Sequence, residues 1–399
     1  MEIRGNLVDV VNHAIYPAAI EILDGKIASV NPLSEAAPGL NYILPGFIDA
    51  HVHIESSMLI PAQFARLAVV HGTVATVSDP HEIANVCGIP GVDFMIDNGR
   101  TVPFKFYFGA PSCVPATTFE TAGASVGVDD IRELLKREEV KYLTEMMNFP
   151  GVLNGDEDCL QKIAAARAEG KPVDGHAPGL MGEAAQQYID AGISTDHECF
   201  TAEEASDKLA RGMKIIIREG SAAKNFDALI HLLHDHPADI MFCSDDKHPD
   251  SLVAGHINLL CKRAVAKGVD LFHVLQAACI NAVQHYRLDV GLLREGDAAD
   301  FIVVKDLENF EVQQTYIGGL LVAEQGESRI EVPAQSAQEN HINHFHCTPK
   351  TPADFAIKTS GHPPPSIKVI EALDGQLITN QLLLPAKVEE NVIVSDLHQ

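Results

Sequence analysis

An apolar, β-prone run that ends in two histidines constrains this chain more than any other part of its sequence. The run reads Leu-Pro-Gly-Phe-Ile-Asp-Ala-His-Val-His over residues 44–53. Residues i and i+2 of an extended strand lie on the same face, so His51 and His53 can direct two imidazoles at one point. Two histidines at the end of a buried strand are typical of a site for a first-row metal ion, which activates water. The alternative is a pair of exposed histidines on a turn.

The middle of the chain alternates between strand-like and helix-like segments. The candidate strands span residues 43–48, 73–77, 103–108, 140–144, 171–174, 193–195, 213–218 and 239–243. The candidate helices span residues 61–71, 129–137, 156–169, 182–191, 201–211 and 225–234, followed by a helical region over 252–287. Several of these helices have Ser, Thr, Asp or Asn near the start and Gly after the end, as helix caps require.

Eight strand-then-helix units in sequence predict an α/β fold with a (β/α)₈ TIM-like barrel. A doubly wound open sheet is the competing architecture. The barrel is favoured because polar residues follow many different strands, and the carboxyl-terminal rim of a barrel brings all the strand ends together.

The segments on either side of the barrel have a common β-rich pattern. Asp24 and Gly25 between apolar runs are a hairpin signal, and β-prone runs return at 301–304 and 316–322. We therefore expect a small β domain built from both segments, the metal-dependent barrel, and an irregular linker with the start of a truncated further domain. These parts span residues 1–42 plus 295–330, 43–294 and 331–399, in that order.

Composition and charge limit the partners of the protein. A net charge of -26 disfavours nucleic acid, because the phosphate backbone would be repelled. We expect no membrane span, because no run of about eighteen apolar residues occurs. The first residues lack the pattern of a signal peptide, and the eight cysteines are scattered, so we expect a cytoplasmic protein with reduced thiols.

Histidines and carboxylates also follow the later candidate strands. Because a carboxylate has two oxygens and can bridge two cations, this set favours two metal ions over one. The first ion is assigned His51, His53 and Asp245, the second His176 and His197, with Glu145 as the bridge. A site with one ion and fewer of these ligands is the alternative.

With these ligands in place, the chain resembles the amidohydrolase superfamily. The resemblance rests on three features: Pro-Gly-Phe-Ile-Asp-x-His-x-His at 45–53, the histidines after strands five and six, and the aspartate after strand eight. Within the superfamily the chain is similar to the bacterial adenine deaminases, over about residues 1–330. The matching stretches are residues 78–86, 146–152, 174–179 and 244–249. Many superfamily members use a carboxylated lysine as the bridge. Lys141 lies at the wrong end of its strand, so the resemblance gives that position to Glu145.

The resemblance implies hydrolytic deamination of adenine to hypoxanthine and ammonia, a step of purine salvage or adenine catabolism. A metal-activated hydroxide would attack C6, with Asp245, Glu145 and His197 as catalytic residues. Asp245 would accept the proton of water and return it to the leaving amino group. The neighbouring Asp246 could exchange roles with it. The resemblance points to two Mn(II) or Fe(II) ions, and Zn(II) also suits these ligands.

Further polar residues follow strands two and seven. Asp79, His81 and Glu82 are candidates for orienting the substrate, relaying protons or supporting the metal ligands, and the alternative is a loop held by local hydrogen bonds. Arg218 and Glu219 are assigned either a salt bridge within the rim or a contact to the purine. The histidine-rich stretch at 341–347 is interpreted as an irregular loop rather than a second metal site.

Two alternative functions remain open at this point. One is another amidohydrolase that acts on a cyclic amide, and the other is a superfamily member without catalysis. The small-molecule partner expected for the main hypothesis is a purine base, and we expect the protein to form a homo-oligomer of two or more subunits.

Overall fold

The structure, a computed structural model, divides into two units. They are Met1–Gln338 and Glu339–Gln399. The described residues are 1–34, 39–117, 119–332, 342, 347–359, 365–373 and 378–397. Within these residues, every helix is too short or too polar to cross a bilayer.

The centre of the first unit is a barrel of parallel strands, formed by a five-stranded sheet and a three-stranded sheet. In ring order the strands are β5 (Phe47–Val52), β6 (Thr73–Ser78), β7 (Lys105–Ala110), β8 (Val140–Met146), β9 (Val173–Gly175), β10 (Thr195–Asp196), β11 (Lys214–Arg218) and β12 (Ile240–Cys243). The amide of Ser194 donates to the carbonyl of Val173 at 2.9 Å, which joins β9 to the segment entering β10. The amide of Asp245 donates to the carbonyl of His51 at 2.9 Å, which joins β12 back to β5. The predicted (β/α)₈ barrel is confirmed.

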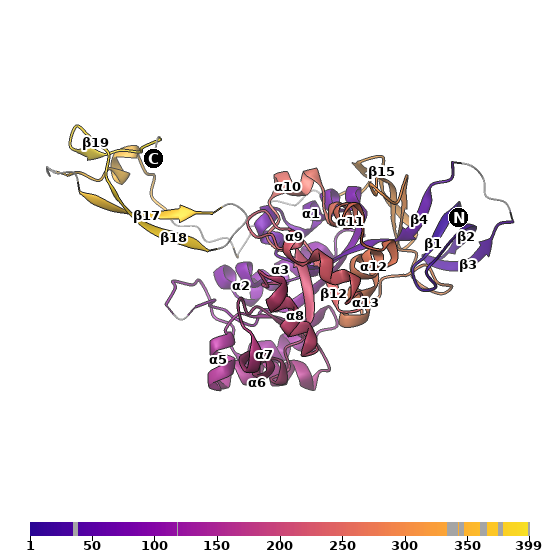
Figure 1. Cartoon of the computed structure of the whole chain (residues 1–399), viewed down its shortest axis with the longest axis horizontal. Coiled ribbons are helices and arrows are strands. Elements are labelled where there is room, and N and C mark those ends of the chain that lie inside the picture. Colours follow the sequence, from indigo (N-terminus) through magenta and orange to yellow (C-terminus); the bar gives the residue numbers. More distant parts are fainter. Residues whose placement is uncertain are drawn as a thin grey trace. The chain divides into compact units, whose positions relative to one another are not determined.

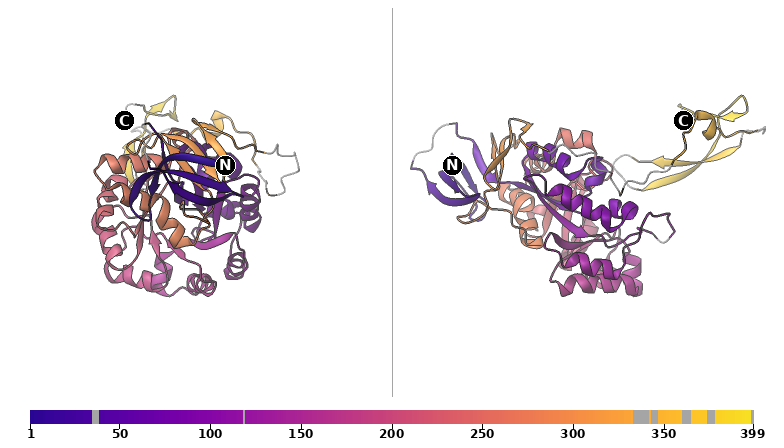
Figure 2. Two further views of the ribbon diagram at one scale, coloured as in Figure 1. Left: turned by 90° about the vertical axis from the view of Figure 1, so that its right-hand side faces the viewer. Right: turned by 180° about the vertical axis from the view of Figure 1, so that it is seen from behind.

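Helices lie outside these strands (Figures 1 and 2). They are α1 (Pro61–Ala68), α2 (His81–Cys87), α3 (Ile89–Gly99), α4 (Val128–Leu135), α5 (Phe149–Asn154), α6 (Glu157–Ala168), α7 (Gly182–Asp190), α8 (Ala202–Ala210), α9 (Phe226–Leu229), α10 (Pro249–Ala254), α11 (Ile257–Ala266), α12 (Leu271–Leu275) and α13 (Asn281–Tyr286). The sequence analysis assigned no helix to the segments of α2, α3 and α5. The structure places Pro90 and Pro150 in the first turns of α3 and α5, where a missing amide hydrogen costs nothing.

A second sheet joins strands from both sides of the barrel segment. Its order is β16 (Glu327–Ser328), β15 (Leu320–Glu324), β14 (Val312–Ile317), β13 (Phe301–Val304), β4 (Tyr42–Pro45), β1 (Glu2–Asp9), β2 (Ala14–Leu23) and β3 (Lys26–Pro32). Strand β13 pairs antiparallel with β4, so the segment after the barrel completes a sheet begun at the N-terminus. The predicted small β domain made of two distant segments is therefore part of the observed fold.

The sequence analysis treated residues 43–48 as one barrel strand, and the structure divides this run at Gly46. Residues before Gly46 belong to β4 of the small sheet, and those after it belong to β5 of the barrel. A β-carbon on Gly46 would lie 2.3 Å from Val74 Cγ1 and 2.4 Å from its Cγ2. The chain can pass between the two sheets here because glycine leaves room for the side chain of Val74.

We expect Gly46→Ala to destabilise the protein by about 1–3 kcal/mol, because the added methyl group overpacks a buried contact. Chemical denaturation measures the free energy of unfolding. The comparison variant is Gly127→Ala, where φ is -92° and the nearest atom to a new β-carbon, Asp130 Oδ2, is 3.8 Å away. Gly127 is the N-cap of α4, so this variant should lose only the smaller free energy of a poorer helix cap. Equal stabilities of the two variants would contradict the packing argument.

The second unit contains two short β-hairpins. The strands are β17 (Ser366–Ala372) with β18 (Thr379–Pro385), and β19 (Val388–Glu389) with β20 (Val392–Ile393). The interpretation of residues 331–399 as a linker and a partial domain stays a prediction. Much of the proposed linker, including all of the histidine-rich stretch except Ile342 and Cys347, lies outside the described residues.

Candidate metal centre

Side chains from the carboxyl ends of five barrel strands meet in one cluster. The end of β5 and the residue that follows it supply two histidines, and the end of β8 supplies a glutamate. The loops after β9, β10 and β12 supply two histidines and an aspartate. Neighbouring members lie within 4.8 Å of one another in overlapping groups. The six predicted ligands brought together are His51, His53, Glu145, His176, His197 and Asp245.

The first group has the spacing of ligands around one cation. His51 Nε2 and His53 Nε2 lie 3.1 Å apart, and Asp245 Oδ1 lies 3.6 Å and 3.4 Å from them. Ligands about 2.1 Å from a tetrahedral metal lie roughly 3.4 Å from one another. Two ring nitrogens this close and this buried point at one position, so the residues present fit a metal ion.

Glu145 stands between this group and a second one. Its Oε1 lies 3.5 Å from His53 Nε2, whereas its Oε2 lies 2.7 Å from His176 Nδ1 and 3.0 Å from His197 Nε2. The carboxylate is only 2% exposed. One oxygen therefore faces His53 of the first group and the other faces both histidines of the second, as a bridge between two cations requires.

The pKa values of these side chains reflect their burial and their close contacts. Burial disfavours the charged form of Glu145, but His176 and His197 lower the pKa of its carboxyl well below its usual value. Burial likewise works against a charged His197, yet Glu145 raises the pKa of that imidazole to about 9. In His51, burial and the neighbouring His197 lower the pKa well below its usual value. The cluster therefore contains a carboxylate that stays ionised and imidazoles that disfavour a positive charge on one another.

Asp245 is held in an unusual backbone conformation. Its φ is 52°, in the left-handed region, where Asp and Asn occur more often than most residues. Its amide donates to the carbonyl of His51 at 2.9 Å, and its carbonyl accepts from the amide of His53 at 3.3 Å. Oδ1 can thus face the two histidines while Oδ2 accepts a hydrogen bond from Arg218 Nη1 at 3.0 Å.

The residues predicted after β6 line the same cluster. Asp79 Oδ2 lies 3.0 Å from His81 Nδ1, and this ring nitrogen is also 3.4 Å from Glu145 Oε1. Glu82 Oε2 lies 3.2 Å from His53 Nδ1. Asp79 is fully buried, whereas the side chain of Glu82 is 35% exposed. These three side chains therefore form a polar wall beside the first group.

The two residues predicted after β11 lie in different surroundings. Arg218 is buried and pairs with Glu198 through both Nη atoms, with Nη2 at 2.9 Å from Oε2, and with Asp245. Glu219 lies apart from the cluster and pairs with Arg263 Nη1 at 2.6 Å. The geometry favours the internal salt bridge over a contact to the purine for Arg218.

Two further residues adjoin the site. Glu198 Oε1 lies 3.4 Å from His197 Nε2, whereas its sequence position beside His197 indicates either support of that ligand or surface solvation. Glu55 follows the His-x-His pair by two residues, accepts the amide of Ile83 at 3.2 Å and has its pKa raised to about 8 by burial. The adjacency of Glu198 to His197 was a signal that could have identified it. Nothing in the spacing marked Glu55.

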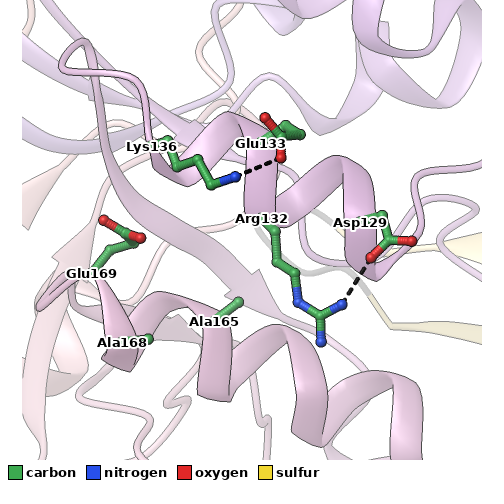
Figure 3. Close-up of a pocket in the computed structure, with 7 residues that line it drawn as sticks. All are labelled: Asp129, Arg132, Glu133, Lys136, Ala165, Ala168 and Glu169. Carbon is green, nitrogen blue, oxygen red and sulfur yellow. Dashed lines mark hydrogen bonds and ion pairs between the residues drawn. The ribbon is translucent and has the colours of Figure 1, made fainter.

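A separate hollow of about 330 Å³ lies between α4 and α6 (Figure 3). Four of its charged side chains are paired along the helix, Arg132 with Asp129 at 2.8 Å and Lys136 with Glu133 at 2.6 Å. None of the predicted ligands lines it. We therefore assign it no part in the chemistry.

Comparison with known proteins agrees with this geometry. Residues 42–322 match the amidohydrolase family. The adenine deaminase of Salinibacter ruber is 55% identical over 394 residues, which are 99% of this chain and 71% of that protein. The adenine deaminase of Sulfurovum sp. is 56% identical over 384 residues, which are 96% of this chain and 70% of that protein.

Solved structures show the same fold at low sequence identity. A β-aspartyl dipeptidase from Fervidobacterium islandicum has a TM-score of 0.61 at 16% identity, covering 82% of this chain and 96% of that chain. An enamidase described as a member of the amidohydrolase superfamily has a TM-score of 0.58 at 16% identity, covering 82% of this chain and 97% of that chain. The chain therefore belongs to the amidohydrolase family and, within it, to the adenine deaminases.

Proposed function

We propose that this chain catalyses the hydrolytic deamination of adenine to hypoxanthine and ammonia. The observation that carries the proposal is the position of Glu145 between the two groups of histidines, in a chain 55% identical to an adenine deaminase. The second candidate function, hydrolysis of a cyclic amide, rests on the amidohydrolase fold alone.

We propose that the site holds two divalent ions. His51, His53 and Asp245 would hold the first, His176 and His197 the second, and Glu145 both. Imidazole and carboxylate donors without thiolate suit Mn(II), Fe(II) or Zn(II), and the family favours the first two. When bound, such ions lower the pKa of a water molecule from about 15.7 to about 7, which makes a nucleophile available near neutral pH.

The chain's own residues then move the protons. Asp245 takes a proton from the water whose oxygen adds to C6 of the purine. The same carboxyl returns a proton to the exocyclic nitrogen, so that the C6–N bond breaks with ammonia as the leaving group and not an amide anion. Arg218, which donates to Asp245 Oδ2 at 3.0 Å, holds the carboxylate in place during both transfers.

We assign the remaining polar wall to the substrate. Asp79, His81 and Glu82 lie beside His53 and Glu145, where they can hold the purine edge next to the first group. Asp246 lies one residue beyond Asp245, but it accepts a hydrogen bond from Ser56 Oγ. We therefore give the proton transfers to Asp245.

Metal removal tests the proposal directly. Purified protein incubated with adenine should release ammonia and form hypoxanthine, and dialysis against a chelator should remove this activity. Addition of Mn(II) should restore it, because the ligands stay in place without the ions. Ring opening of a hydantoin or dihydropyrimidine without ammonia from adenine would instead support the second function.

The cytoplasmic location and the homo-oligomer stay predictions. Sedimentation velocity of the purified protein measures the oligomeric state, and a monomer at micromolar concentration would contradict the second of them.

A further inference from the structure

A fully buried lysine lies behind the two loops that carry the second pair of histidines. Lys208 on α8 is 0% exposed. Its ammonium group donates to the carbonyl of Ala177 at 2.8 Å, to Asp196 Oδ2 at 2.7 Å and to Glu204 Oε1 at 2.7 Å. An ammonium group has three donors, so all of them are used.

Two of these oxygens adjoin the histidines. Ala177 directly follows His176 in the loop after β9, and Asp196 directly precedes His197 at the end of β10. Asp196 also accepts the amide of Glu198 through Oδ1 at 2.7 Å. One ammonium group therefore joins the backbone of the first histidine loop to the carboxylate at the base of the second.

The third oxygen strengthens the same connection. Glu204 accepts the amide of Gly179 at 2.8 Å, in the loop after β9, and the amide of Phe200 at 3.2 Å, in the loop after β10. Its position is set by the start of α8, where Thr201 caps the helix by accepting the amide of Glu204 at 3.2 Å. The first turn of α8 thus holds both loops.

His197 needs such backbone support. A histidine that binds metal is usually oriented by a hydrogen bond from its other ring nitrogen. His197 Nδ1 is buried and has no hydrogen-bond partner among the described residues. With no partner at Nδ1, its ring orientation depends on Glu145 at Nε2, on the stacked ring of His51 and on its backbone, which Asp196 holds on one side.

The chemistry of the cluster also indicates a geometric role. Burying an ion pair costs desolvation, and apolar residues of similar size often stabilise a fold as well or better. Burial opposes a charged Lys208, yet Asp196 raises the pKa of its ammonium above the usual value. Beyond packing, the charged cluster around Lys208 fixes the loop after β9 relative to the loop after β10.

We propose that Lys208 is a positioning residue that holds His176 and His197 at the separation needed to share the second ion. The inference rests on the two-ion site proposed above. Lys208 acts through the loops, because its ammonium group bonds to Ala177, Asp196 and Glu204 and to neither histidine ring.

Titration of the metal-free protein with Mn(II) tests this inference without an activity assay. Free Mn(II), counted by electron paramagnetic resonance, gives the number of bound ions and their affinities. We expect two ions in the wild type. In Lys208→Met the first ion should bind as in the wild type, and the second 10–100-fold more weakly, about the loss typical of removing support for a metal ligand.

The matched control is Lys171→Met. The ammonium group of Lys171 donates to the carbonyls of Leu135, Arg137 and Val140, at the amino ends of the barrel strands and away from the histidines. This variant should bind both ions with wild-type affinity. Thermal unfolding of both variants checks that each is folded during the titration, because Lys208→Met also leaves buried carboxylates unpaired. In the folded proteins, loss of loop positioning weakens the second ion in Lys208→Met alone and leaves its first ion unchanged.

Glu204→Gln keeps the test decisive, because Lys208→Met leaves two buried carboxylates unpaired. The amide keeps the shape of Glu204 and weakens its hold on the ammonium, so the second ion should again bind more weakly than in the wild type. Wild-type affinity for that ion in a folded Lys208→Met protein, or in Glu204→Gln where the former does not fold, overturns the inference and leaves the proposed function standing. A wild-type protein that binds fewer than two ions overturns the two-ion site, and this inference with it.

Discussion

Replacing Glu145 by Gln is expected to lower kcat/KM for adenine by more than about 10²-fold while the protein stays folded. Loss of a residue that merely supports a metal ligand costs about 10–100-fold in activity, and Glu145 is proposed as a ligand of both ions. Its Oε1 faces His53 and its Oε2 faces His176 and His197. The amide of Gln offers one neutral oxygen in place of two anionic ones, so it cannot bridge two cations.

The measurement has two parts. Ammonia release from adenine gives the activity, and Mn(II) titration should show one tightly bound ion in Glu145→Gln where the wild type has two. The control is Glu133→Gln on α4, whose side chain is 71% exposed and which lies outside the cluster. Thermal unfolding monitored by circular dichroism reports whether both variants fold. Wild-type activity in folded Glu145→Gln would remove this residue from the bridge.

The positions of the candidate ligands were predictable because each lies at, or just after, the carboxyl end of a barrel strand. Two-residue periodicity places His51 and His53 on one face, and parallel strands bring the residues that follow them to a common rim. That reasoning required knowing which segments form strands, but not the exact residues at which the strands end. The first strand shows the limit, because a single apolar run conceals the change of sheet at Gly46, which depends on the space taken by Val74.

The pairing inside the site was not predictable in the same way. Arg218 joins Glu198 and Asp245, which lie on either side of it in sequence at the ends of other strands. Spacing along the chain does not say which carboxylates an arginine meets across a barrel rim. Lys208 was missed for the same reason, because it lies on a helix whose pattern indicates only that one face is buried.

Asp245→Asn should lower kcat by about 10²–10⁴-fold, the contribution typical of a group that transfers protons in the transition state. Asparagine is nearly the same size and also tolerates the φ of 52° at this position, so the backbone should stay in place. Its single amide oxygen cannot both face the first ion and accept from Arg218 as the two carboxylate oxygens do, so the activity is assayed at saturating Mn(II). With the ion bound, the loss should appear mainly in kcat and not in KM, since an amide cannot take up the proton of water.

Asp246→Asn is the matched control, one residue along the chain and with the same change of charge. Asp246 accepts a hydrogen bond from Ser56 Oγ, and an amide oxygen can replace its carboxylate oxygen in that contact. It does not belong to the group formed by His51, His53 and Asp245, although it approaches His53 together with Glu82. We expect its effect on kcat to be at least tenfold smaller than that of Asp245→Asn, because the latter carboxylate alone faces both histidines of the first group. If kcat fell further in Asp246→Asn than in Asp245→Asn, the proton transfers would belong to Asp246. Because both variants lose one negative charge, the change of charge alone cannot explain a difference between them.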